Sequence, residues 1–131
     1  MTSEDLKNRT MDFAVRVLKL VAALPKNVAG KTVGNQLARS GTSVAANYRA
    51  ALRAKSTPDF INKITIILEE ADESSFWMEL TDRAELLPPG KITALRQEAE
   101  ELVKIFNATR STSKRKAASS TNSRKRPNQQ S

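Results

Sequence analysis

The sequence predicts an all-α fold: an antiparallel up-down-up-down four-helix bundle in residues 1–110, with a disordered basic C-terminal tail in residues 111–131. Apolar residues recur every three or four positions along four segments, which is the spacing of one helical face. The connections between these segments are short, and short connections favour antiparallel neighbours. Residues 111–131 lack this periodicity and are rich in serine, asparagine, glutamine and basic residues, a composition typical of disorder.

The first two helices are expected at residues 4–24 and 32–55. The first follows a capping Thr2 or Ser3 and ends at Pro25. Its main apolar face is formed by Leu6, Thr10, Phe13, Val17, Leu20 and Leu24. The second helix carries Gly41 in its middle, and glycine inside a helix costs about 1 kcal/mol relative to alanine. We therefore expect a close helix crossing at Gly41.

The third and fourth helices are expected at residues 57–86 and 91–109. Thr57 is the expected N-cap of the third helix, with Pro58 at the first helical position. Pro88, Pro89 and Gly90 separate the two helices. The fourth helix repeats apolar residues at heptad-like positions, namely Ile92, Leu95, Ala99, Leu102 and Phe106.

Composition narrows the chemistry that this chain can perform. The 131 residues include no cysteine and no histidine, which removes disulfides, thiolate zinc sites and the commonest general base. Catalysis or metal binding would then rest on the carboxylates of residues 69–73, a weak basis because bundle metal sites use histidine as well. We expect no enzyme activity, no cofactor, no metal and no small-molecule substrate.

The location of the protein is also constrained by the sequence. No apolar run approaches the roughly 18 residues of a membrane span. Residues 1–24 are interrupted by charges and lack a signal-peptide pattern. We expect a cytoplasmic protein without membrane contact.

The net charge of +8 lies mainly in the tail, and residues 1–110 carry only +2. Basic tails bind nucleic acid through its phosphates, without base specificity and with strong salt dependence. The alternative is a solubilising tail with no binding role. The six basic residues of residues 111–131 form two clusters: Lys114, Arg115 and Lys116, then Arg124, Lys125 and Arg126.

A second basic feature lies on the second helix. Arg39, Arg49 and Arg53 fall within an arc of roughly 80° when successive residues turn by 100°. This strip is either a phosphate-binding surface or a solvated, ion-paired face. The third helix carries an acidic run in residues 69–73, where Glu69 and Glu73 would repel each other without a cation nearby. We favour an interhelix network that is formed by Arg39, Asn47, Glu70 and Glu73.

The first and third helices carry more apolar width than one four-helix core uses. An exposed apolar surface of this kind is typical of an interface between copies of the same chain. The alternative is a broad helix buried within a single copy. The expected interface residues are Phe76, Trp77 and Leu80.

The run from Gln36 to Arg49, QLARSGTSVAANYR, is the most specific of several stretches with a known likeness, and residues 6–10, 13–17, 59–63, 69–73 and 76–80 carry the rest. Together these stretches resemble the small bacterial four helix bundle proteins encoded in intervening sequences of large-subunit ribosomal RNA genes. The likeness covers about residues 5–110. Relatives commonly have an acid after Asn-Tyr-Arg, where this chain has Ala50, so the second helix is one charge more basic.

The resemblance implies an antiparallel bundle and a homopentameric ring. It also implies kinship with the accessory variability determinant of diversity-generating retroelements, a basic pentamer that works with a reverse transcriptase and nucleic acid. We therefore expect a non-enzymatic homo-oligomer that binds RNA or DNA, with a reverse transcriptase as a candidate partner. The alternative is a protein-only scaffold or partner-binding module.

Overall fold

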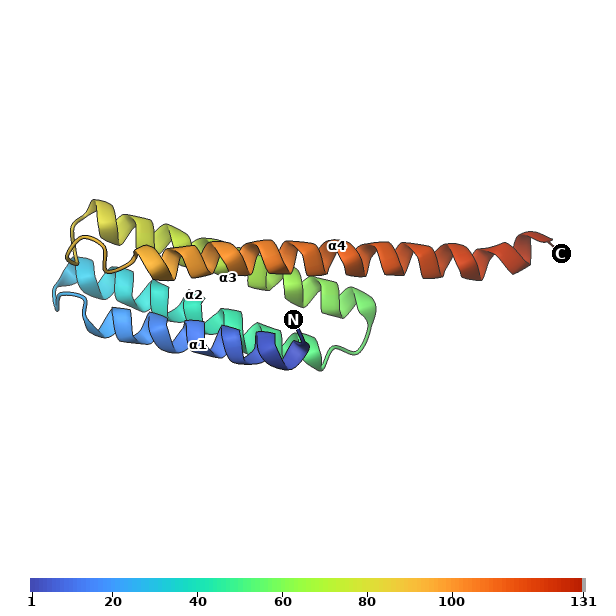
Figure 1. The fold of residues 1–131 in the computed structure, drawn as a ribbon, viewed down its shortest axis with the longest axis horizontal. Helices are drawn as coiled ribbons and strands as arrows, with labels where there is room; N and C mark the ends of the chain where they lie inside the picture. Colours follow the sequence, from blue (N-terminus) through green and yellow to red (C-terminus); the bar gives the residue numbers. More distant parts are fainter. Residues whose placement is uncertain (131) are drawn as a thin grey trace.

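The computed structural model describes the backbone of residues 1–130 and the side chains of residues 1–120. Within these residues the chain forms four helices, α1 (Ser3–Ala22), α2 (Val28–Leu52), α3 (Thr57–Arg83) and α4 (Thr93–Gln130). They run up, down, up and down, and α4 continues past the end of the bundle (Figure 1). The predicted antiparallel four-helix bundle is confirmed.

Side-chain caps set the starts of the first three helices. Thr2 caps α1 in a capping box, because its backbone N–H donates to Asp5 at 2.9 Å and its hydroxyl accepts from the Asp5 N–H at 3.1 Å. Ser56, rather than the expected Thr57, caps α3.

The start of α2 differs from the predicted one by about a turn. Asn27 is the cap, since its side-chain oxygen accepts a hydrogen bond from the Gly30 N–H at 2.9 Å. Gly30 precedes the expected helix start at residue 32, but it lies in the first turn of α2. A Cβ atom there would lie 1.8 Å from the Pro25 carbonyl oxygen, so only glycine allows this helix start.

The core runs along the inside of the bundle. Its largest fully buried side chains include Phe13 on α1, Leu37 on α2, Ile64 and Met78 on α3, and Phe106 on α4. Helix α1 packs along α2, α2 along α3, and α3 along α4, whereas α1 and α4 meet over a much shorter stretch. The seam between α1 and α4 is therefore the least closed side of the bundle.

Gly41 lies at the crossing of α2 with α1. A Cβ atom at this position would lie 2.7 Å from both γ carbons of Val17, which is fully buried on α1. The expected close approach is therefore present, and Val17 is the side chain that occupies the space.

Residues 111–120 are helical, which differs from the predicted tail beginning at residue 111. They continue α4, which ends at Gln130. Extending a helix that is already packed against the bundle needs no new nucleation. No glycine or proline interrupts residues 91–126, and Ala117 and Ala118 favour a helix. The sequence showed a loss of apolar periodicity there, which marks the end of the core and not the end of the helix.

No helix in the described part of the chain is both long and apolar enough to cross a membrane.

Candidate nucleic-acid interface

The three arginines on the outer side of α2 fall into two groups. Arg39 faces α3, and its Nη1 donates to Glu70 Oε2 at 2.9 Å, while its Nη2 donates to Glu73. Its hydrogen bond to Glu73, followed by the charges of Glu70 and Glu73, raises the pKa of the Arg39 guanidinium. The carboxylates take up this guanidinium, so Arg39 is not a free cation for a phosphate.

The network around Arg39 differs from the predicted one in two members. Asn47 is not part of it, because its Nδ2 donates to the Ser43 carbonyl within α2 at 2.9 Å. Trp77 belongs to it, since its indole Nε1 donates to Glu73 Oε2 at 3.3 Å. The spacing of four residues between Glu73 and Trp77 was the sequence signal for this contact.

A small polar contact explains the unusual composition of α2. Ser40 and Ser74 are fully buried, and their hydroxyl oxygens lie 2.9 Å apart between α2 and α3. The Ser74 hydroxyl also lies 2.9 Å from the Glu70 carbonyl oxygen. Small side chains at these positions let the two helices approach, and hydrogen bonds satisfy their polar atoms.

Arg49 and Arg53 are exposed, and neither guanidinium has a hydrogen bond or ion pair among the described residues. An acid at position 50 would lie three residues before Arg53, a helical pairing distance, but the residue there is Ala50. Both arginines therefore present free cations on the last turns of α2.

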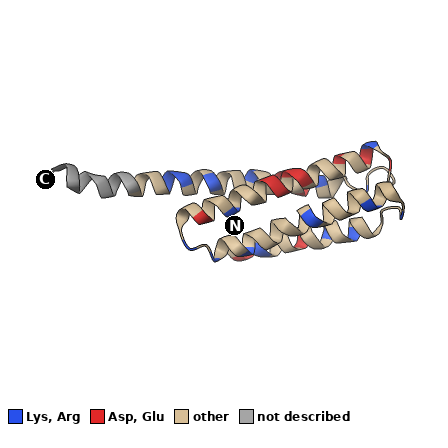
Figure 2. Cartoon of the chain, turned by 180° about the vertical axis from the view of Figure 1, so that it is seen from behind, with Lys and Arg blue, Asp and Glu red and all other residues tan. Residues whose placement is uncertain are grey.

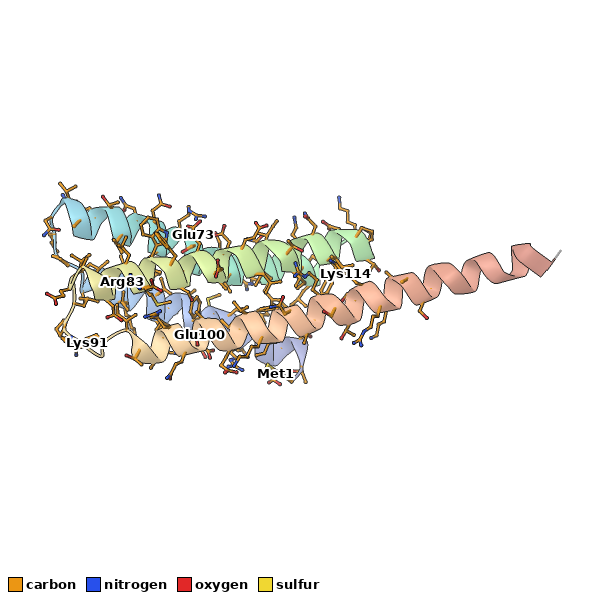
Figure 3. All side chains as sticks on the ribbon, turned by 90° about the horizontal axis from the view of Figure 1, so that it is seen from above. Met1, Glu73, Arg83, Lys91, Glu100 and Lys114 are labelled. Carbon is orange, nitrogen blue, oxygen red and sulfur yellow. The ribbon has the colours of Figure 1, made fainter. Side chains whose placement is uncertain are left out.

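The basic residues of α4 lie at the same end of the bundle. Lys114, Arg115 and Lys116 are exposed, and Arg115 donates to Thr112 Oγ1 at 3.2 Å. Figure 2 shows basic residues on α4 where it leaves the bundle, and Figure 3 labels Lys114 near the start of α3. A shallow groove joins this part of α4 to the α2–α3 connection, with Lys55 and Lys116 among its lining residues. We call this surface the basic end; it comprises Arg49, Arg53, Lys55, Lys114, Arg115 and Lys116.

The second basic cluster of the tail, Arg124, Lys125 and Arg126, lies outside the residues whose side chains the structure describes.

Two apolar faces point away from the core. On α1, Met11, Val15 and Leu18 form a stripe, each more than 40% exposed. On α3, Phe76 is 56% and Leu80 38% exposed. Of the three expected interface residues, the structure places Phe76 and Leu80 on this outer face of α3. The third, Trp77, is half-buried, and its ring lies against Phe76 at a centroid distance of 4.9 Å.

The acidic residues of α3 do not assemble a metal site. In the part of the chain with described side chains, no three or more histidine, cysteine, aspartate or glutamate residues are grouped so that they could hold a metal ion.

The arrangement of helices defines the class of protein: a small all-α bundle with a serine- and glycine-bearing second helix. A model of the 23S rRNA-intervening sequence protein family matches residues 4–108, and the chain belongs to this family. The comparison with curated proteins returns no match.

A solved structure supports the same assignment. It is described as a protein with unknown function from the S23 ribosomal protein family of Bacteroides thetaiotaomicron, determined at 1.70 Å resolution. It is 35% identical in sequence to this chain, with a TM-score of 0.72, and the match covers 79% of this chain and 96% of that one.

Proposed function

We propose that this protein is a non-enzymatic homo-oligomeric bundle whose basic end binds the phosphates of RNA or DNA. The observation that carries the proposal is the division of the α2 arginines. Arg39 is engaged by two carboxylates, whereas Arg49 and Arg53 are unpaired and lie at the end where α4 carries Lys114 to Lys116. Exposed cations without protein partners bind phosphate backbones by releasing counterions.

The binding is expected to be independent of base sequence. Its six cations contact phosphates, which carry no sequence information, and the half-buried Phe60 in the adjoining groove offers only stacking, which every base can make. The resemblance to the accessory variability determinant makes a reverse transcriptase the protein partner in this proposal.

The nucleic-acid part is tested with fluorescence anisotropy on single-stranded RNA across a salt series. Each lost phosphate contact lowers the slope of log K against log salt by about 0.7 on a single strand. Replacing Arg49 and Arg53 with glutamine should therefore lower the slope by about 1.4 per bound chain. Arg39→Gln is the matched control on the same helix, and it should leave the slope unchanged because Arg39 is already paired. An equal effect of all three substitutions, or no effect of any, would refute the proposed interface.

The oligomeric part rests on two apolar faces of different composition, one on α1 and one on α3. A contact between two different surfaces is head-to-tail, and head-to-tail contacts close into rings when the rotation permits. A pentamer, as the family resemblance implies, is such a ring. Glutamate at either face should then break the assembly, because it buries a charge without a partner.

Light scattering coupled to size exclusion distinguishes this arrangement from others. Leu18→Glu and Phe76→Glu should each yield smaller species, while Val28→Glu, at an 83% exposed residue on the first turn of α2, should leave the assembly intact. In a mixture of the two variants, Leu18→Glu keeps an intact α3 face and Phe76→Glu keeps an intact α1 face. These two faces should pair and form a dimer. A mixture that stays monomeric would show that the two faces do not meet.

A further inference from the structure

A groove lies at the opposite end of the bundle from the basic end, where α1 and α4 do not pack closely. It runs along the last turns of α1 from Arg16 to the C-cap Ala23, past the α3–α4 connection, to the first turn of α4. At 1.5 Å per residue this stretch of α1 is about 10 Å long, or two helical turns. We call it the α1–α4 groove; Figure 3 labels Lys91 at this end of the molecule.

The floor of the groove is apolar. Leu20 and Leu87 are half-buried and Leu95 is buried beneath them, with Pro88 and Ala94 beside them. These side chains belong to α1, the α3–α4 connection and α4, and an added apolar side chain would remove them further from water. Removing apolar surface from water in this way favours binding.

The rim of the groove is basic. Arg16, Lys19 and Lys91 line it and are exposed, and none of their charged groups has an ion pair among the described residues. None of the residues that line the groove is acidic. The groove therefore combines an apolar floor with three cations that lack partners.

The occupant must match both properties. A nucleic acid would place hydrated phosphates over the leucines, and no aromatic residue lines the groove to stack a base. The chain's own residues 111–131 carry six cations and no acid, so the rim would repel them. An amphipathic helix with acids beside its apolar face satisfies the floor and the rim together.

We propose that the α1–α4 groove binds an acidic amphipathic helix of a partner protein. Two apolar side chains four residues apart would rest on Leu20 and Leu87, and carboxylates on both sides of them would pair with Arg16, Lys19 and Lys91. The proposal is independent of nucleic-acid binding, because it uses the other end of the bundle. In an assembled ring, one end of each chain would contact nucleic acid and the other a protein.

The test uses the full-length chain and a labelled synthetic peptide of about 14 residues, or four helical turns. The peptide carries leucine on one face and glutamate elsewhere. Its two controls are a scrambled peptide of equal composition and a peptide with lysine in place of glutamate. The acidic amphipathic peptide should bind, and each control should bind at least about tenfold more weakly, a difference of about 1.4 kcal/mol.

Variants of the chain place the binding in the groove. Lys91→Glu should lower the affinity about tenfold or more, since it sets a like charge against the peptide. Lys26→Glu is the matched control, because Lys26 is exposed on the α1–α2 connection and does not line the groove. In the unmodified chain, the methyl NMR signals of Leu20, Leu87 and Leu95 should shift when the peptide is added. This measurement does not depend on how well any variant folds.

Three results would overturn the proposal. Equal binding of the scrambled peptide would show that the groove does not recognise an amphipathic helix. Displacement of the peptide by RNA, with the same methyl signals shifting, would assign the groove to nucleic acid. Shifts of these signals with protein concentration alone would assign it to a second copy of the chain, whose α3 also carries an acidic and apolar outer face.

Discussion

Gly41 offers a quantitative test of how α1 and α2 pack. A methyl group at this position would lie 2.7 Å from both γ carbons of Val17, closer than side-chain atoms normally approach. Val17 is β-branched, fully buried and confined to few rotamers in a helix, so it cannot easily move away. Overpacking of this kind costs about 1–3 kcal/mol, while replacing glycine by alanine inside a helix returns about 1 kcal/mol.

The balance of these two contributions is a loss of up to about 2 kcal/mol in the free energy of unfolding of Gly41→Ala. Urea denaturation followed by circular dichroism, at one fixed protein concentration because of assembly, measures the change. Ala46→Gly on the exposed side of α2 measures the helix-propensity contribution within the same helix. Gly41→Leu should destabilise the protein more than Gly41→Ala does.

Val17→Ala separates the clash from other effects of the substitution. Alone it should destabilise the protein, because it leaves a cavity in the core. In the Gly41→Ala background it should cost at least about 1 kcal/mol less, since it removes the atoms that the new methyl group meets. A Gly41→Ala variant that is more stable than the parent, with additive effects of the two substitutions, would show that the helices do not cross at this distance.

Two further predictions concern contacts of the core and the α1–α4 seam. Arg9 on α1 donates to both carboxylate oxygens of Glu98 on α4 at 2.8 Å, and the pair is half-buried. A double-mutant cycle with alanine at both positions should give a coupling free energy of about 1–2 kcal/mol. A coupling near zero would mean that water separates the two side chains. Burial raises the pKa of the Tyr48 phenol above 10.0, so the folded state disfavours its ionisation and stability should fall as the pH rises past that value. Tyr48→Phe should make the urea midpoint less dependent on pH above 10.0, and an unchanged dependence would contradict the burial of the phenol.

The architecture could be predicted from the sequence because its signals are local and repeated. Spacings of three and four residues locate the buried faces, and Pro25 and Pro88 separate helices. The helix boundaries could be predicted less well from the sequence. Asn27 and Gly30 looked like parts of a loop, because the close approach of Gly30 to Pro25 is a tertiary contact that no local pattern reveals.

The candidate site was only partly accessible from the sequence. The helical arc grouped Arg39 with Arg49 and Arg53, but it could not show which of them faces α3. A rotation of only about 40–80° around the helix separates the paired guanidinium of Arg39 from the free ones of Arg53 and Arg49, and only the packing of α2 on α3 sets that rotation. The α1–α4 groove was not predicted at all, since it arises where two helices distant in sequence fail to close.

The most direct test of the central claim compares RNA binding of the full chain with that of residues 1–110 across a salt series. The two proteins should elute as the same assembly, since the core ends at Phe106. Loss of Lys114, Arg115 and Lys116 alone should lower the slope of log K against log salt by about 2 per bound chain. The shortened chain should keep a weaker, salt-dependent binding that Arg49→Gln and Arg53→Gln together remove. An affinity that does not respond to salt, or a slope that the truncation leaves unchanged, would contradict the assignment of the basic end as the nucleic-acid interface.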